Sequence, residues 1–128
     1  MRLGYTLLYV PDVTAAITWW ERAFGLARRF IHEGGDYGEL DTGGVALGFV
    51  AEGLASSHGF GFRAQRPDAP PPAVELGLLC DDVPGAFARA VAAGARPLSP
   101  PEAKPWGQVV AYVSDLNGFL VELCTPMG

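Results

Sequence analysis

The sequence lacks the features of membrane and nucleic-acid-binding proteins. It has no apolar run near the roughly 20 residues that span a bilayer. Its start, MRLGYTLLYVPD, has neither a full signal-peptide core nor a cleavage site, so we expect a cytoplasmic location. There is no Lys/Arg run, and 9 basic against 14 acidic residues give a formal net charge of -5. Because such a chain repels polyanions, we expect neither a nucleic-acid nor a membrane partner.

The sequence is also poor in the residues that form disulfides or hold transition metals. Its two cysteines, Cys80 and Cys124, lie in apolar strand-like runs without CxxC or Cys/His spacing. We expect reduced, largely buried thiols at both positions. Its two histidines, His32 and His58, have no Cys, Asp or Glu at recognisable metal spacing. Neither histidine is therefore included in the candidate site.

What the sequence does contain is an internal repeat. With 49% hydrophobic residues among 128, the chain can bury the core of one domain. YVPDVTAAITWW can be laid over LCDDVPGAFARA, which matches Asp12 with Asp82 at an offset of 82 minus 12, or 70. Each Asp predicts a helix N-cap, and apolar residues follow at helical spacing. Each helix is expected to stop at a glycine, Gly25 or Gly94.

A second repeat completes two copies of one unit. YGELDTGGVALGFV is similar to AYVSDLNGFLVELC, and Asp41 matches Asp115 at an offset of 115 minus 41, or 74. Together with the apolar strand before each helix, this predicts an α+β fold of paired βαβββ modules. We predict a single domain at 1–128 that consists of module 1 at 1–54 and module 2 at 73–128. A Gly/Pro-rich linker at 55–72 joins the modules and is expected to be partly strand near GFGFRA.

The order of these motifs resembles a known family. VPDV, the pair Trp19 and Trp20, FGL, DDVPGAFARAVAAGA and WGQVVAYVSDLNGFLVEL look like the vicinal oxygen chelate superfamily. Its members include glyoxalase I, bleomycin- and fosfomycin-resistance proteins and extradiol dioxygenases. The resemblance covers essentially the whole chain and implies mixed sheets that curl around a cavity, as well as a homodimer. It does not select one activity, because this fold carries several chemistries.

The resemblance also implies where a metal would bind. Active members hold a divalent cation through His, Glu or Gln on the first and last strands of each module. The repeat offsets place these positions at Tyr5, Gly48, Glu75 and Glu122. Glycine offers no ligand and a neutral phenol is a poor one, whereas two carboxylates with water can hold a hard cation. We therefore expect no metal cofactor, and only Glu75 and Glu122 as ligands if a metal is present.

Strand alternation predicts which side chains share the cavity side of the sheets. Glu75 and Glu122 should lie close together there, either as a polar anchor for a bound molecule or facing water at an open mouth. Trp106, on a loop, can stack on a flat ligand or plug the cavity or the dimer seam. The candidate ligand-binding residues are Tyr5, Tyr9, Glu75, Trp106, Gln108, Tyr112 and Glu122.

Three functions fit these residues. The first is a metal-independent, dimeric, bleomycin-resistance-like protein that sequesters an aromatic or cationic organic compound, since acidic cavities suit basic drugs. The second is a metal-dependent glyoxalase-like lyase or isomerase, or a dioxygenase, in which a carboxylate binds metal or abstracts a proton. The third is an accessory protein with a vestigial cavity. The sequence leaves open whether the protein is an enzyme and which molecule it binds.

Overall fold

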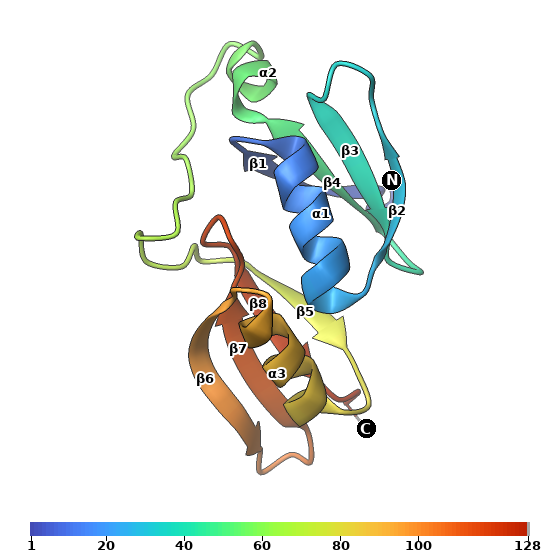
Figure 1. Ribbon diagram of the computed structural model, residues 1–128, viewed down its shortest axis with the longest axis vertical. Coiled ribbons are helices and arrows are strands. Elements are labelled where there is room, and N and C mark those ends of the chain that lie inside the picture. Colours follow the sequence, from blue (N-terminus) through green and yellow to red (C-terminus); the bar gives the residue numbers. More distant parts are fainter. Residues whose placement is uncertain (128) are drawn as a thin grey trace. The chain divides into compact units, whose positions relative to one another are not determined.

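The computed structural model describes residues 1–127, in two compact units, Met1–Ala64 (unit 1) and Gln65–Gly128 (unit 2) (Figure 1). Gly128, the last residue of the predicted module 2, lies outside the described residues. Each unit contains a four-stranded mixed sheet and a helix packed on it. The predicted α+β fold of paired βαβββ modules is therefore confirmed. No helix within residues 1–127 is long and apolar enough to cross a membrane.

Unit 1 is a βαβββ module followed by a short helix. Its elements are β1 (Tyr5–Val10), α1 (Val13–Phe24), β2 (Ala27–Ile31), β3 (Tyr37–Asp41), β4 (Ala46–Ala51) and α2 (Glu52–Ser56). The strand order is β1-β4-β3-β2, with β1 parallel to β4 and the other pairs antiparallel. The helix α2 was not predicted, because five residues are too few to show a helical period.

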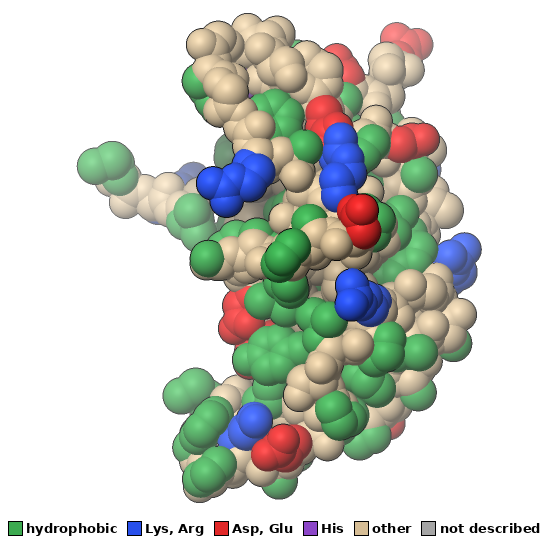
Figure 2. Space-filling view, turned by 90° about the vertical axis from the view of Figure 1, so that its left-hand side faces the viewer, with side chains coloured by type: hydrophobic (Ala, Val, Ile, Leu, Met, Phe, Trp, Pro, Cys, Tyr) green, Lys and Arg blue, Asp and Glu red, His purple; other side chains and the backbone are tan. Residues whose placement is uncertain are grey.

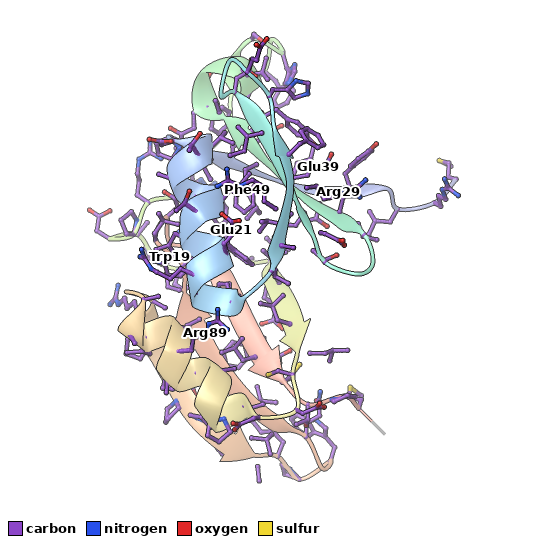
Figure 3. The ribbon with its side chains drawn as sticks, turned by 45° about the vertical axis from the view of Figure 1, so that its right-hand side comes forward. Trp19, Glu21, Arg29, Glu39, Phe49 and Arg89 are labelled. Atoms are coloured by element: carbon purple, nitrogen blue, oxygen red, sulfur yellow. The ribbon has the colours of Figure 1, made fainter. Side chains whose placement is uncertain are left out.

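The predicted caps delimit α1. The carboxylate of Asp12 accepts a hydrogen bond from the Ala15 amide at 3.0 Å, and Gly25 ends the helix in the left-handed conformation with φ 72°. The buried side of α1 carries Trp20, which is fully buried and contacts Phe49 with ring centroids 5.9 Å apart. Figure 3 shows Phe49 between α1 and the sheet. This face of the sheet is therefore the hydrophobic core of unit 1.

Unit 2 repeats the same module. Its elements are β5 (Glu75–Leu79), α3 (Val83–Ala92), β6 (Arg96–Ala103), β7 (Val109–Ser114) and β8 (Leu120–Cys124), with the strand order β5-β8-β7-β6. Asp82 caps α3 as predicted, by accepting from the Gly85 amide at 3.0 Å. The predicted stop is displaced by one residue, since Ala93 is the C-cap and Gly94 follows it with φ 110°.

The edge strand β6 is protected by its composition. Its sequence, RPLSPPEA, contains three prolines, which have no backbone N–H to offer to another chain. Figure 2 shows hydrophobic side chains, the class that includes proline, gathered over the lower half of the view with isolated charged groups between them. The register of β6 on β7 shifts twice, which adds irregularity to this edge.

The segment between α2 and β5 contains no strand among its described residues, so the predicted strand near GFGFRA is wrong. Phe62 of this stretch instead packs edge-on against Tyr9 of β1, with ring centroids 5.0 Å apart. The following part is fixed to unit 2 by the Gln65 amide, which donates to the carbonyls of Gly118 at 3.0 Å and Pro70 at 3.1 Å.

Candidate functional site

The face of each sheet that is turned away from its helix is called here the helix-free face. In unit 2 a row across β5, β8 and β7 joins Gly77, Glu122 and Tyr112 on this face. The Tyr112 hydroxyl donates to Glu122 Oε1 at 3.0 Å. A β-carbon added at Gly77 would meet Glu122 Oε2 at 3.5 Å. The second oxygen of Glu122 therefore borders the space that the missing side chain of Gly77 leaves.

Glu75 shares this face with Glu122, as the sequence predicts, because it lies two residues before Gly77 on β5. Partial desolvation, together with the charge of Glu122, raises the pKa of Glu75 above its ordinary value although the residue is largely exposed. Burial and the bond to Glu122 raise the pKa of Tyr112 to about 12, so its hydroxyl stays a donor at neutral pH. The two carboxylates form an acidic pair that a cation would relieve.

The pH dependence of stability tests this acidic pair. A carboxyl whose folded-state pKa is raised keeps its proton longer than the unfolded chain, so stability is lost as pH rises above about 4.3. We expect Glu75→Gln to raise the free energy of unfolding at about pH 7, and with it the Tm, by less than about 1 kcal/mol because the group is exposed. Near pH 3 the substitution should leave the stability unchanged.

The matched control for this prediction is Glu102→Gln. The Glu102 carboxylate lies 3.7 Å from Lys104 Nζ, so this variant loses an attraction rather than a repulsion. Thermal unfolding followed by circular dichroism at both pH values compares the two variants. An equal gain in both, or a gain for Glu75→Gln that persists at low pH, would contradict the assignment.

Trp106 is held in place although its ring is exposed. Its indole Nε1 donates to Gln108 Oε1 at 2.7 Å, and the Gln108 amide donates to the Thr125 carbonyl at 2.8 Å. Gln108 is buried, whereas Trp106 is 61% exposed. A fixed indole with a free face is a stacking surface that loses little side-chain entropy on binding. The structure thus brings Trp106 together with Gln108, and Tyr112 together with Glu122.

The cysteines supply no reactive group to this face. Both are free, and Cys124 is buried at the end of β8 next to the backbone of Cys80. Burial and the neighbouring Glu122 raise the pKa of Cys124 to about 11, and burial also raises that of Cys80. Both thiols stay protonated at neutral pH, and a protonated thiol is a poor nucleophile.

The two remaining predicted residues lie on β1 in unit 1. Tyr5 and Tyr9 share the helix-free face of that sheet, as alternation predicts, together with Leu7 between them. Tyr5 is 61% exposed, whereas the ring of Tyr9 is engaged by Phe62. Tyr5 is therefore the more available of the two for a ligand.

At Gly48, the other predicted position of unit 1, any side chain would have to displace two neighbouring side-chain ends. A β-carbon there would lie 2.6 Å from Leu7 Cδ2 and 2.8 Å from the Tyr37 hydroxyl. That hydroxyl donates instead to Glu39 Oε2 at 2.6 Å, and Arg29 Nε lies 3.8 Å from Glu39 Oε1. Glu39 is only 6% exposed, and Figure 3 shows it with Arg29 on the side of the strands away from α1.

Glu39 is not among the predicted site residues because the repeat offset of 74 is one residue too large for β3. The cross-strand partner of Gly48 is Glu39, and that of Glu122 is Tyr112, so β3 and β7 correspond at 112 minus 39, or 73. The sequence offset of 74 pairs Glu39 with Val113, which faces the core. Each unit in fact places one carboxylate and one tyrosine hydroxyl in contact on its helix-free face.

The sequence of this chain matches the model of one known protein family. The model of the Glyoxalase/Bleomycin resistance protein/Dioxygenase superfamily matches residues 2–123. The chain belongs to this superfamily. A search of curated proteins finds no match. The superfamily assignment confirms the family resemblance seen in the motifs of both halves.

Several solved structures share the fold of this chain. A glyoxalase-related enzyme from Fulvimarina pelagi is 22% identical, with TM-score 0.83 over 98% of this chain and 88% of that chain. TioX from Micromonospora sp. ML1 is 25% identical, with TM-score 0.74 over 98% of both chains. A family enzyme from Burkholderia phytofirmans PsJN is 18% identical, with TM-score 0.77 over 98% of both chains.

The donor atoms of this chain do not fit the metal that the superfamily fold implies. At the four positions, Gly48 offers no donor atom and is closely approached by Leu7 and Tyr37, and Tyr5 offers only a phenol. Glu122 is already bonded to Tyr112, which leaves one free oxygen beside Glu75. Among residues 1–127, no three His, Cys, Asp or Glu side chains come together to hold a metal ion. We therefore derive no chemical step through a metal.

Proposed function

We propose that this superfamily member binds a flat organic cation on the helix-free face of unit 2, without a metal, and acts by sequestering it. The observation that carries the proposal is the acidic pair Glu75 and Glu122. Within residues 1–127 neither carboxylate has a basic partner, so a ligand cation is the missing counter-charge. Tyr112 orients Glu122 and stays protonated.

Trp106 supplies the second contact for the same ligand. Gln108 and Tyr112 are four residues apart along one strand direction, which separates them by roughly 13 Å. A flat cationic ring system that spans about this distance can place a charged amino group near Glu122 while its ring stacks on Trp106. Stacking of a cationic aromatic system on indole contributes roughly 0.5–2 kcal/mol. The ligand class is therefore an extended aromatic amine rather than a compact ion.

The experiment is calorimetric titration with the flat cation proflavine. Loss of the charge in Glu122→Gln should weaken binding roughly tenfold, since a hydrogen bond to a charged group is worth about 1.5–3 kcal/mol. Trp106→Ala should weaken it by roughly three- to tenfold through lost stacking. The control is Glu102→Gln, which removes the same charge from an exposed pair with Lys104 and should change affinity by less than about twofold.

Two results would overturn the proposal. If wild type does not bind proflavine, or if Glu102→Gln weakens binding as much as Glu122→Gln, the acidic pair is not a specific anchor. Turnover of a ketoaldehyde–thiol adduct that depends on added Ni²⁺ and on Glu122 would instead favour a glyoxalase-like lyase.

A further inference from the structure

Unit 1 contains a cavity of about 520 Å³ that no part of the proposed function uses. It lies on the helix-free face at the start of β1 and β4, next to the β3–β4 turn. Its walls include Arg2, Tyr5, Arg29, Glu39 and Val45. Its volume falls within the range of pockets that hold small organic ligands.

The charges in this cavity favour an anion. Arg2 has no ion-pair or hydrogen-bond partner within residues 1–127. Arg29 Nε lies 3.8 Å from Glu39 Oε1, which is too far for a hydrogen bond, so the donors of this guanidinium stay available. Glu39 is already hydrogen-bonded to Tyr37. Two guanidinium groups against one carboxylate make the cavity locally positive in a chain whose formal net charge is -5.

The other walls of the cavity favour an anion that also carries an apolar group. Tyr5 is 61% exposed, Val45 is 40% exposed and Leu3, also at the cavity, is 74% exposed. Guanidinium groups bind carboxylates in a planar, bidentate geometry, while an exposed phenol ring offers a stacking face. A flat carboxylic acid satisfies both kinds of wall at once.

We propose that this cavity is a second ligand site, which binds an aromatic carboxylate through Arg2 and Arg29 with its ring against Tyr5. The site differs from the proposed cation site in unit, residues and charge. Glu39 opposes the ligand by competing for Arg29, so its removal strengthens binding. This sign separates a binding role from a purely structural one, because loss of folding weakens every ligand.

The test is a titration of the full chain with benzoate, followed by backbone amide NMR shifts at residues 2–5 and 44–46. A ligand of this size should bind with a roughly millimolar Kd. Arg29→Gln should weaken binding about tenfold and Arg2→Gln at least about threefold, because each removes a charge-assisted hydrogen bond. Glu39→Gln, which keeps an acceptor for Tyr37, should strengthen binding severalfold.

Arg28→Gln is the matched control. Arg28 is the preceding residue on β2, but its guanidinium bonds Glu21 at 2.9 Å and Thr18 at 3.2 Å on α1. Its loss should leave benzoate affinity unchanged. The proposal is overturned if benzoate does not shift these amides, if Arg28→Gln acts like Arg29→Gln, or if Glu39→Gln weakens binding. Benzylamine should not shift the same amides, which keeps this outcome separate from that for the cation site.

Discussion

Replacement of Gly118 by alanine is expected to lower the free energy of unfolding by about 2–4 kcal/mol. Gly118 has φ 93°, a conformation that side chains other than glycine rarely adopt. An added β-carbon would also collide with the backbone carbonyl oxygen of Arg66 and lie 2.9 Å from Gln65 Nε2. Backbone atoms cannot rotate away as a side-chain end can, so the turn or the linker must move.

The movement would release the segment that precedes β5. Gln65 Nε2 bonds the Gly118 carbonyl, and the turn itself is held by Asp115, whose carboxylate accepts from the amides of Asn117 and Phe119 at 2.9 and 2.8 Å. Alanine at Gly118 breaks the first contact and strains the second. We therefore expect faster hydrogen exchange at residues 65–70 and 115–119 than in wild type.

The variant Gly43→Ala measures the cost of backbone strain in the absence of a steric clash. Gly43 lies in the β3–β4 turn with φ 79°, but a β-carbon there meets nothing within 4 Å. This variant should lose only about 1–2 kcal/mol, from backbone strain alone. Urea unfolding followed by circular dichroism gives both values. Equal losses for the two variants would show that the contact of Gly118 with the linker does not contribute to stability.

The sequence was sufficient for the features that local rules govern. The caps Asp12 and Asp82 depend on hydrogen bonds within one turn, and the strand faces of Glu75 and Glu122 depend only on alternation. These features reappear in the structure at the predicted residues.

Features that depend on contacts between distant segments could not be predicted. The bond of Gln65 to Gly118 joins residues 53 apart in the chain. Glu39 was not predicted because the hairpins of the two units differ in length by one residue. In a repeat alignment, a shift of one residue assigns a side chain to the opposite face of the sheet. The cavity around Arg29 also depends on a bulge in β2, where the pairing with β3 shifts between Arg28 and Phe30.

Gly48→Glu, which installs the acidic side chain that the first module lacks, is expected to cost about 3 kcal/mol or more and to create no metal site. Its β-carbon must displace Leu7 Cδ2 and the Tyr37 hydroxyl, which breaks the bond to Glu39. The new carboxylate would also lie beside Glu39, which is 6% exposed and already paired with Arg29. Like charges at a buried position destabilise the fold further.

Smaller substitutions separate the contributions to this loss in the free energy of unfolding. Gly48→Ala should lose about 1–3 kcal/mol by overpacking, and less in a Tyr37→Phe background, which removes the hydroxyl that the β-carbon meets. Gly77→Ala is the control, since its β-carbon makes only an ordinary 3.5 Å contact with Glu122, and it should be neutral or slightly stabilising. Urea unfolding ranks the four variants, and calorimetry with Mn²⁺ and Ni²⁺ tests for metal. Tight, stoichiometric binding by Gly48→Glu with stability near that of wild type would refute the argument that Leu7 and Tyr37 close this position to a ligand.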